Sequence, residues 1–326
     1  MQQRRQSGDR DGELWAITSY FNPRHFRRRL ANYKTFHRQL AVPLVTVEWS
    51  CDGVFELDTS DADVLIQLGS PDLMWQKERL LNLAVAAVPQ HVQRIAWLDC
   101  DVVFGRPDWW REALHLLDRV ALVQLFSLCH DLGTTAQCGV FDPSDVISSA
   151  ESFVQISRRP GSEEILFDRL WGSEVRNGRV VRRGRLSGFA WAAQRDLLER
   201  HGLYDACVLG SGDRAYACAA FGKQRHARQG WLQNARQREH YLRWAEPLAA
   251  EVGGSISLVE GELFHLWHGS VNARRYRDRY IRFERFGFDP FDDIIKDAAG
   301  LWRWASDKTE MHRFVAEYFS QRQEDG

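Results

Sequence analysis

Short apolar runs alternate with amphipathic segments along the first 125 residues of the chain. Runs rich in β-branched residues are typical of buried strands, whereas apolar positions three and four residues apart are typical of helices. This pattern predicts strands at 14–20, 43–50, 63–69, 94–104 and 119–126, and helices at 23–40, 71–89 and 107–118. Such alternation favours an α/β fold with a mixed, mainly parallel sheet flanked by helices.

The rest of the chain is irregular at first and then regains a clear pattern. Residues 127–185 carry glycine, serine and an arginine-rich stretch at 175–185. Beyond them we expect the following elements: a strand and a helix within 186–205, a helix after 210–213, a polar helix at 234–251, and strands at 255–260 and 262–268. The segment 273–322 is amphipathic and predicted to be helical.

No internal repeat and no obvious linker divides the chain. We therefore expect a flexible tail at 1–12, one domain at 13–285, and a helical C-terminal extension at 286–326 packed on that domain. Trp302 and Trp304 are expected to lie on a helix of this extension.

Composition restricts the class of protein. The chain is 44% hydrophobic and 27% charged, and its 43 basic and 44 acidic residues leave a net charge of −1. A strongly basic nucleic-acid-binding protein is therefore not favoured. Only five of the basic residues are lysines. The arginine surplus suits phosphate-rich ligands, or it reflects the codon usage of a GC-rich genome. The 13 tryptophans indicate either a large aromatic core or platforms for sugar stacking.

The cysteines and the N-terminus indicate the compartment. The six cysteines form no CxxC pair, so neither a disulfide framework nor a zinc knuckle is expected. The polar N-terminus lacks the apolar core of a signal peptide. No stretch approaches the roughly 18–20 apolar residues of a membrane helix. We therefore expect a soluble, cytoplasmic protein with free thiols and no transmembrane segment.

Two aspartates, Asp99 and Asp101, directly follow the most strand-like segment of the chain. Ligands bind at the carboxyl ends of strands in open α/β sheets, and residues i and i+2 of an extended chain point the same way. Two carboxylates at one site need a cation, and their hard oxygens suit Mn²⁺ or Mg²⁺, which can bridge a diphosphate. The alternative is a strand-end turn in which one aspartate caps the helix near Pro107.

The segment IAWLDCDVVF (95–104) resembles the metal-binding DxD element of GT-A glycosyltransferases. The resemblance implies a Rossmann-like GT-A fold. It also implies that Asp101 binds a divalent metal, and that Asp99 and Asp101 contact the ribose and diphosphate of a nucleotide sugar.

Two earlier segments extend this resemblance. LWAITSYFNP (14–23) is similar to the first strand of the superfamily, whose following loop receives the nucleotide base. This implies that Thr18, Ser19 and Tyr20 lie near the base. MWQKERLLNLAV (74–85) is similar to a helix that precedes the DxD strand in bacterial members. By that analogy Lys77 reaches a phosphate or an acidic neighbour; the alternative is a solvated helix face formed with Glu78.

A glycine-rich element spans 188–213, GFAWAAQRDLLERHGLYDACVLGSGD. Asp213 is expected to begin a helix, whose dipole favours a carboxylate there, so an ordinary N-cap is one role. The layout resembles the GG(W/S)A…GGED element of β-1,4-galactosyltransferases and polypeptide N-acetylgalactosaminyltransferases. That resemblance implies that Gly188 and Trp191 line the donor sugar and that Asp213 is the general base of an inverting reaction.

The same element departs from the family pattern at its end. The family's acidic pair is replaced by Asp213-Arg214, so either one carboxylate serves as base or the base lies elsewhere. Trp191 is equally a stacking platform for the sugar or a core residue.

The segment FHLWHG (264–269) ends a predicted strand. In an extended chain His265 and His268 point to opposite faces, so only one reaches the metal unless a turn intervenes. The GT-A resemblance implies a third metal ligand from a late histidine, and we favour His268. No HExxH is present, which disfavours a hydrolytic zinc site. The arginine-dense stretch 272–285 is either a lid over the diphosphate or an amphipathic helix, with Arg274 and Arg275 the candidates for phosphate contact.

Taken together, the resemblance implies a hexosyltransferase that moves a sugar from a nucleotide sugar, UDP-linked, to an acceptor hydroxyl with inversion, using Mn²⁺ or Mg²⁺. The acceptor (a glycan, glycolipid, protein, nucleic acid or other hydroxyl compound) is not identified. Arginines at 176, 179, 182, 183 and 185 would suit an anionic one. One rival is an inactive glycosyltransferase-like protein that binds a glycan or a partner. The other is a nucleotidyltransferase, whose usual glycine-rich phosphate loop is missing from TSYFNPRH (18–25).

Overall fold

The computed structural model describes most of the chain. It covers residues 13–134, 143–162, 166–167, 173–176, 179–182, 186–228, 234–269 and 278–325. The tail expected at 1–12 lies outside these residues. Within the described part, no helix has both the length and the apolar character needed to cross a lipid bilayer.

Helices and strands follow one another much as the alternating pattern predicts. The α-helices are α1 (Arg27–Gln39), α2 (Lys77–Ala87), α3 (Trp109–Leu117), α4 (Phe153–Ser157), α5 (Arg195–His201), α6 (Gly212–Ala220), α7 (Ala235–Val252), α8 (Asp278–Phe283) and α9 (Thr309–Ser320). The strands are β1 (Leu14–Phe21), β2 (Leu44–Ser50), β3 (Val64–Gly69), β4 (Arg94–Leu98), β5 (Val102–Phe104), β6 (Leu122–Gln124), β7 (Leu128–Leu132), β8 (Val146–Glu151), β9 (Ser173–Arg176), β10 (Arg179–Arg182), β11 (Ala190–Gln194), β12 (Ile256–Leu258), β13 (Glu262–His265), β14 (Ile294–Lys296) and β15 (Trp302–Trp304).

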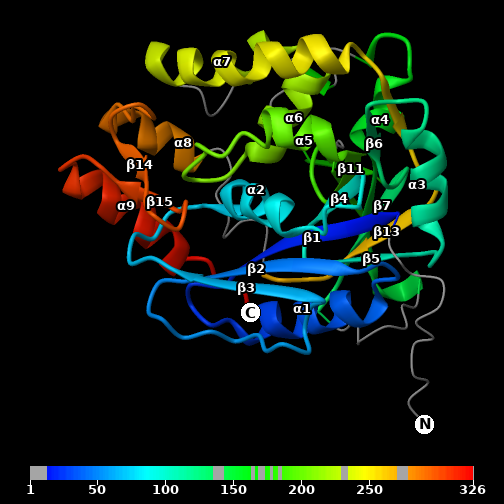
Figure 1. Cartoon of the computed structure of the whole chain (residues 1–326), viewed down its shortest axis with the longest axis horizontal. Coiled ribbons are helices and arrows are strands. Elements are labelled where there is room, and N and C mark those ends of the chain that lie inside the picture. Colours follow the sequence, from blue (N-terminus) through cyan, green and yellow to red (C-terminus); the bar gives the residue numbers. More distant parts are fainter. Residues whose placement is uncertain are drawn as a thin grey trace.

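A seven-stranded sheet in the order β12-β6-β11-β4-β1-β2-β3 forms the centre of the molecule (Figure 1). Strand β1 pairs in parallel with β2 and β4, β2 with β3, and β12 with β6, while β11 runs antiparallel between β4 and β6. The expected mixed, mainly parallel sheet flanked by helices is therefore confirmed. The carboxyl ends of β1 and β4 lie side by side, at the kind of edge where open α/β sheets bind ligands.

Side chains alternate between the two faces of this sheet, and each face has its own core. Ile17 and Ile95 pack with residues of α2, α5, α6 and α7, whereas Ala16 and Ala96 pack with residues of α1 and α3. Both faces are thus covered, so every residue of β2 and every residue of β1 except Trp15 is buried.

A smaller sheet, in the order β5-β13-β7-β8, continues from the central one. The chain leaves the central sheet at Leu98 and joins the smaller sheet at Val102. Strand β13 lies between β5 and β7, so that His265 is paired with Val102 on one side and with Asp131 on the other. This pairing brings a histidine and a third aspartate beside the turn that carries Asp99 and Asp101.

Two predicted elements are shortened or divided because tertiary contacts override the local pattern. The strand expected over 94–104 is broken into β4 and β5 by the turn between them. The helix expected over 71–89 begins only at Lys77. Before it, Trp75 donates its backbone N–H to Val208, and the side chain of Gln76 bonds to the backbone of Trp302.

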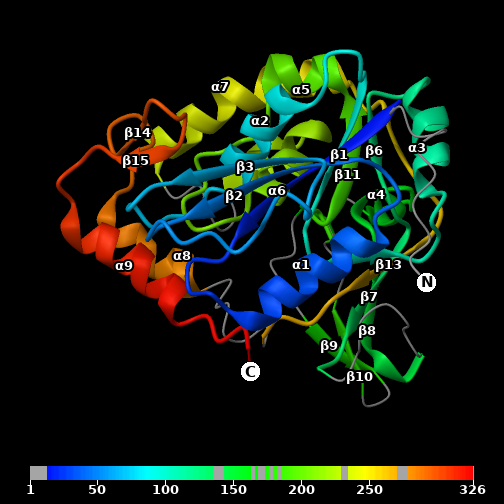
Figure 2. The same cartoon turned by 60° about the horizontal axis from the view of Figure 1, so that its bottom comes forward.

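The C-terminal extension contains a hairpin, β14–β15, as well as helix α9 (Figure 2). Trp302 and Trp304, expected on a helix, lie on β15 instead. Both pack against the core that covers one face of the central sheet, a long-range contact that the local pattern does not reveal. Helix α9 places Phe319 against Trp75, with ring centroids 6.1 Å apart. The chain end then runs to the start of α1, which both views show.

Candidate functional site

The turn between β4 and β5 directs its two aspartates to different partners. Asp99 contacts Lys77, whereas Asp101 contacts His268. The chain turns after Leu98, where an extended chain was expected, so the two carboxylates have different direct partners although they lie close enough to interact electrostatically. The turn instead joins two neighbouring groups. We call them the histidine cluster (Asp101, His265, His268) and the lysine cluster (Lys77, Glu78, Asp99, Asp213).

In the histidine cluster each residue offers one ligand atom, and these atoms all lie within 4.8 Å of one another. Nε2 of His268 is 2.9 Å from Oδ2 of Asp101, and Nε2 of His265 is 3.9 Å from Oδ1. The two Nε2 atoms are 3.2 Å apart. Both histidines are candidates from the sequence, although an extended chain would bring only one of them to this point. Both reach it, since strand β13 ends at His265 and the chain that follows brings His268 beside the same carboxylate.

An acidic side chain lies beside Nδ1, the second ring nitrogen, of each histidine. Nδ1 of His265 lies 2.8 Å from Oδ1 of Asp131, and Nδ1 of His268 lies 3.7 Å from Oε2 of Glu324. Neither acid was predicted from the sequence. Asp131 arrives through the pairing of β7 with β13, and Glu324 arrives from the chain end, so no local motif marks them.

The histidine cluster has the chemistry of a divalent-metal site. Carboxylate oxygens and imidazole nitrogens are ligands for metals of the Mn²⁺ class. Oδ1 of Asp101 is buried and accepts no hydrogen bond from the described residues, which is unusual for a carboxylate oxygen and would be satisfied by a bound cation. Burial would raise the pKa of Asp101, but His268, His265 and Arg29 hold it below its usual value. The carboxylate is therefore ionised, as a metal ligand must be.

The lysine cluster adjoins the histidine cluster through Asp99. Nζ of Lys77, at the start of α2, is 2.5 Å from Oδ1 of Asp99 and 2.9 and 3.1 Å from the two carboxylate oxygens of Asp213. Lys77 and Glu78 are only 8% and 4% exposed. Their burial excludes the alternative of a solvated helix face.

Burial also changes the protonation of the lysine cluster. Desolvation raises the pKa of Glu78 to about 8 and that of Asp99 to about 6, against the opposing effect of Lys77. Burial alone would lower the pKa of Lys77, but Asp213 and Asp99 raise it well above its usual value. Asp99 and Asp213 thus share one lysine, and a cation in the adjoining histidine cluster would offset the remaining negative charge.

Glycines make room for two acids of the lysine cluster. A Cβ atom at Gly188 would lie 2.9 Å from Oδ2 of Asp213, and one at Gly212 would lie 2.2 Å from Cδ of Glu78. Asp213 lies in the first turn of α6, but Ser211 is the N-cap, so Asp213 is not the cap of the alternative interpretation. Its side chain is 32% exposed, which leaves it accessible to a ligand.

The end of β1 supports the turn rather than forming an open surface. Thr18 is fully buried and donates to the last carbonyl of β4 at 2.7 Å, and Ser19 is 9% exposed. The hydroxyl of Tyr20 donates to the carboxylate of Glu56 at 2.8 Å, and Asn22 donates to the same group at 2.7 Å. Glu56 was not predicted from the sequence, since it comes from the loop after β2.

Trp191 lies in the core of the molecule. It is 2% exposed, and its ring is stacked on Trp97 with centroids 6.5 Å apart and an interplanar angle of 11°. Its Nε1 donates to the carbonyl of Ser187 at 2.9 Å. Of the two roles left open for Trp191, packing accounts for this environment.

Several predicted arginines cannot be assigned a contact. Arg274 and Arg275, the expected phosphate contacts, lie outside the described residues. The arginine-rich stretch 175–185 forms part of strands β9 and β10. Its arginine side chains lie outside the part of the chain that the structure describes; they are those of Arg176, Arg179, Arg182, Arg183 and Arg185.

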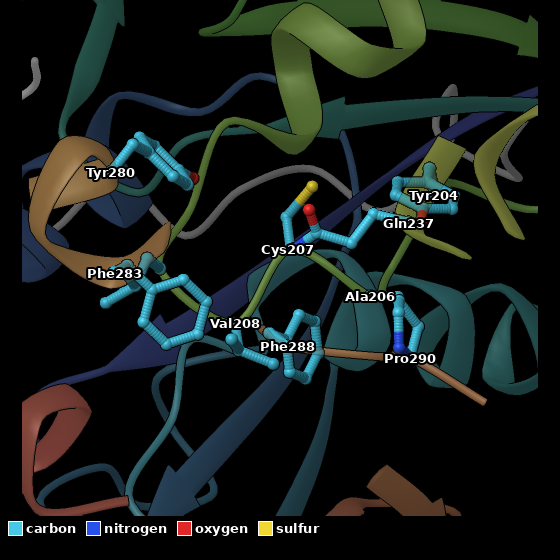
Figure 3. A pocket seen from close by; sticks show the side chains of 10 residues that line it. Tyr204, Ala206, Cys207, Val208, Gln237, Tyr280, Phe283, Phe288 and Pro290 are labelled. Carbon is cyan, nitrogen blue, oxygen red and sulfur yellow. The ribbon is translucent and has the colours of Figure 1, made fainter. Parts of the chain in front are cut away.

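A small apolar cavity lies beside the segment that connects α5 with α6 (Figure 3). Among the residues that line it are Cys207, Tyr280, Phe283 and Phe288, and none belongs to either cluster. Its volume is about 20 Å³, enough for about one water molecule. The cavity is therefore a packing feature and not a substrate site.

Comparison with known proteins supplies no family. No family model matches the sequence, and no curated protein matches it. Among solved structures, the 1–349 fragment of S. aureus TarS in complex with UDP-GlcNAc is similar with a TM-score of 0.36 and 9% identity, over 94% of this chain and 72% of that one.

Two further solved structures show comparable similarity. The mannosyltransferase PcManGT from Pyrobaculum calidifontis, in complex with GDP-Man and Mn²⁺, has a TM-score of 0.31 and 16% identity, over 74% of this chain and 73% of that one. A 4-diphosphocytidyl-2C-methyl-D-erythritol synthase from Anaerococcus prevotii DSM 20548 has a TM-score of 0.30 and 8% identity, over 94% and 98%. TM-scores this low give no evidence about function. The function therefore rests on the geometry of the site.

Proposed function

We propose that this chain is a metal-dependent glycosyltransferase of the GT-A type that moves a sugar from a nucleotide sugar to an acceptor hydroxyl. The observation that carries the proposal is the adjacency of the two clusters across the turn from Asp99 to Asp101. Sugar transfer from a nucleotide diphosphate needs positive charge for the leaving group and a base for the incoming hydroxyl. The histidine cluster suits the first need, and Asp213 suits the second.

Asp101, His265 and His268 would hold Mn²⁺ or Mg²⁺. When bound, the metal supplies charge that neutralises the departing diphosphate. The buried Asp101 oxygen without a hydrogen bond supports this assignment, as do the two Nε2 atoms beside the same carboxylate.

Asp213 is the proposed general base. The acceptor hydroxyl attacks the anomeric carbon, the bond from that carbon to the diphosphate oxygen breaks, and the hydroxyl proton passes to the Asp213 carboxylate. Attack from the face opposite the leaving group inverts the configuration. Lys77 bonds to both carboxylate oxygens and so fixes their orientation, and Gly188 leaves the space they occupy.

Among the other predicted residues, Asp99 would orient the ribose of the donor. The loop that follows β1 would lie on the side of the base, as the sequence resemblance implies. We propose a UDP-linked sugar as the donor, as the sequence resemblance implies.

A thermal-shift panel of UDP-, GDP-, dTDP- and CMP-sugars, each with Mn²⁺ or with EDTA, tests the proposal. We expect a UDP-sugar to raise the melting temperature only with Mn²⁺, because the metal would neutralise the diphosphate of the bound donor. A ligand at about 100 times its Kd adds about 2.7 kcal/mol of stability. Asp101→Asn should lose the shift. Asp118→Asn is the matched control, because the Asp118 side chain is 57% exposed. If no nucleotide sugar shifts the wild-type protein under either condition, the proposal fails.

Turnover then separates the two rivals. An inactive binding protein would show the thermal shift without releasing a nucleoside diphosphate. A nucleotidyltransferase would release pyrophosphate from a nucleoside triphosphate.

A further inference from the structure

We propose that Glu324, near the C-terminal end of the chain, is a positioning residue for His268, and that residues 322–325 form a strap which holds the histidine cluster in place. The inference rests on the metal site of the proposed function. Nε2 of His268 lies 2.9 Å from Asp101, while Nδ1 of the same ring lies 3.7 Å from Oε2 of Glu324. One imidazole therefore lies between two carboxylates, an arrangement that orients the ring of a ligating histidine.

Glu324 is itself held firmly. Its side chain is 4% exposed and forms ion pairs with Arg29 of α1 and with Arg322, the latter at 2.7 Å. A buried carboxylate between two guanidinium groups keeps one orientation, because moving it would leave buried charges unpaired. The position of His268 thus depends on the docking of the chain end against α1.

The backbone around His268 is shaped to admit the strap. Gly269 has φ +89°, and a Cβ atom there would lie 2.4 Å from the carbonyl oxygen of Gln323. Only glycine combines this conformation with so close an approach. Beyond Glu324, the carboxylate of Asp325 accepts the backbone N–H groups of Arg27 and Arg28 at 3.2 and 2.8 Å. The strap therefore packs closely against Gly269 at Gln323 and is anchored to α1 at Asp325.

The other histidine of the cluster is held in a similar way. Asp131 contacts Nδ1 of His265 at 2.8 Å, and Ser148 donates to the second oxygen of Asp131 at 2.5 Å. Both proposed histidine ligands thus have a carboxylate behind them. Asp131 belongs to the smaller sheet and Glu324 to the chain end, so metal binding should be coupled to the docking of the strap.

Calorimetric titration of Mn²⁺, alone and with UDP present, into the full chain tests the inference. Loss of a carboxylate behind a ligating histidine typically weakens metal binding about 10–100-fold, so we expect that loss in Glu324→Gln and in Asp131→Asn. Glu317→Gln, an exposed position on α9, is the matched control and should bind Mn²⁺ as the wild type does. Urea denaturation of the metal-free variants reports any purely structural effect, which would lower stability without changing the Mn²⁺ affinity.

The outcomes separate the two proposals. Wild-type Mn²⁺ affinity in a folded Glu324→Gln variant would overturn the role of Glu324 and leave the metal site standing. Absence of Mn²⁺ binding by the wild-type chain, with and without UDP, would overturn both. If Glu324→Gln does not fold, Asp325→Asn decides, because Asp325 is exposed and anchors the strap by accepting the backbone N–H groups of Arg27 and Arg28. Weakened Mn²⁺ binding in Asp325→Asn supports the strap, and unchanged binding overturns it.

Discussion

Nζ of Lys77 lies 2.5 Å from Oδ1 of Asp99, which joins the start of α2 to the turn at the end of β4. The same ammonium group bonds to Asp213 in the first turn of α6. The positions of the two aspartates are therefore not independent, because one buried cation holds both. This shared contact connects the proposed metal site with the proposed base.

Lys77→Met should destabilise the protein and reduce its activity. Removing one partner of a fully buried ion pair costs about 3–5 kcal/mol. Since Asp99 and Asp213 keep part of their exposure, we expect about 2 kcal/mol here. Urea denaturation measures the loss. Lys296→Met, at an exposed lysine, is the control and should stay within about 0.5 kcal/mol of the wild type. Equal stability of the two variants would show that Lys77 does not hold the cluster together.

Asp213→Asn should slow turnover strongly while leaving donor binding intact. The amide cannot accept the hydroxyl proton, and loss of a general base typically costs about 10²–10⁴-fold in rate. The measurement is sugar transfer or donor hydrolysis, alongside nucleotide-sugar binding by calorimetry. Asp196→Asn, at a side chain that is 61% exposed, serves as the control. Wild-type turnover in Asp213→Asn would mean that the base lies elsewhere.

Gly188→Ala should reduce the rate more than it reduces stability. The new Cβ would meet the end of the Asp213 side chain at 2.9 Å, so the carboxylate moves and the backbone does not have to. Misplacing a reacting group by about 1 Å can cost about 10²-fold in rate. Gly69→Ala is the control, since the nearest atom to its Cβ would be 3.7 Å away. A normal kcat for Gly188→Ala, measured with saturating donor, would argue against the placement of Asp213.

Glu78→Gln should change how stability depends on pH. Burial raises the pKa of Glu78 from 4.5 to about 8, so between these values the folded protein holds a proton that the unfolded chain releases. The contribution of Glu78 to stability therefore falls as the pH rises from 4.5 to about 8, by at most about 1.4 kcal/mol per pH unit. Glutamine does not ionise and should remove this slope. Urea denaturation at pH 5, 6.5 and 8 measures it, with Glu317→Gln as control. Parallel profiles for the wild type and Glu78→Gln would contradict the assignment.

Much of the fold follows from local pattern, because strands of a mainly parallel sheet are buried on both faces and appear as short apolar runs. The runs that became β1, β2 and β4 are clear for this reason. The same logic does not reveal where a strand leaves one sheet for another, and so β4 and β5 were predicted as one strand. The hairpin with Trp302 and Trp304 was missed because its side chains pack against distant elements.

The candidate site was predictable only where chemistry is concentrated in a short motif. Asp101 and His268 belong to such motifs, and the structure brings them within 2.9 Å of each other. Asp131 and Glu324 belong to none. One arrives through strand pairing and the other through the docking of the chain end, and both events depend on tertiary contacts that a single sequence does not display.

Release of UDP from a UDP-sugar, measured by chromatography with increasing Mn²⁺, tests the central claim most directly. The wild-type chain should release UDP in the presence of Mn²⁺ and stop in EDTA. Asp101→Asn should be slower by about 10²–10³-fold, even in excess Mn²⁺, because the charge that stabilises the leaving diphosphate is no longer held in place. Full turnover by Asp101→Asn, or by the wild-type chain in EDTA, would contradict the account.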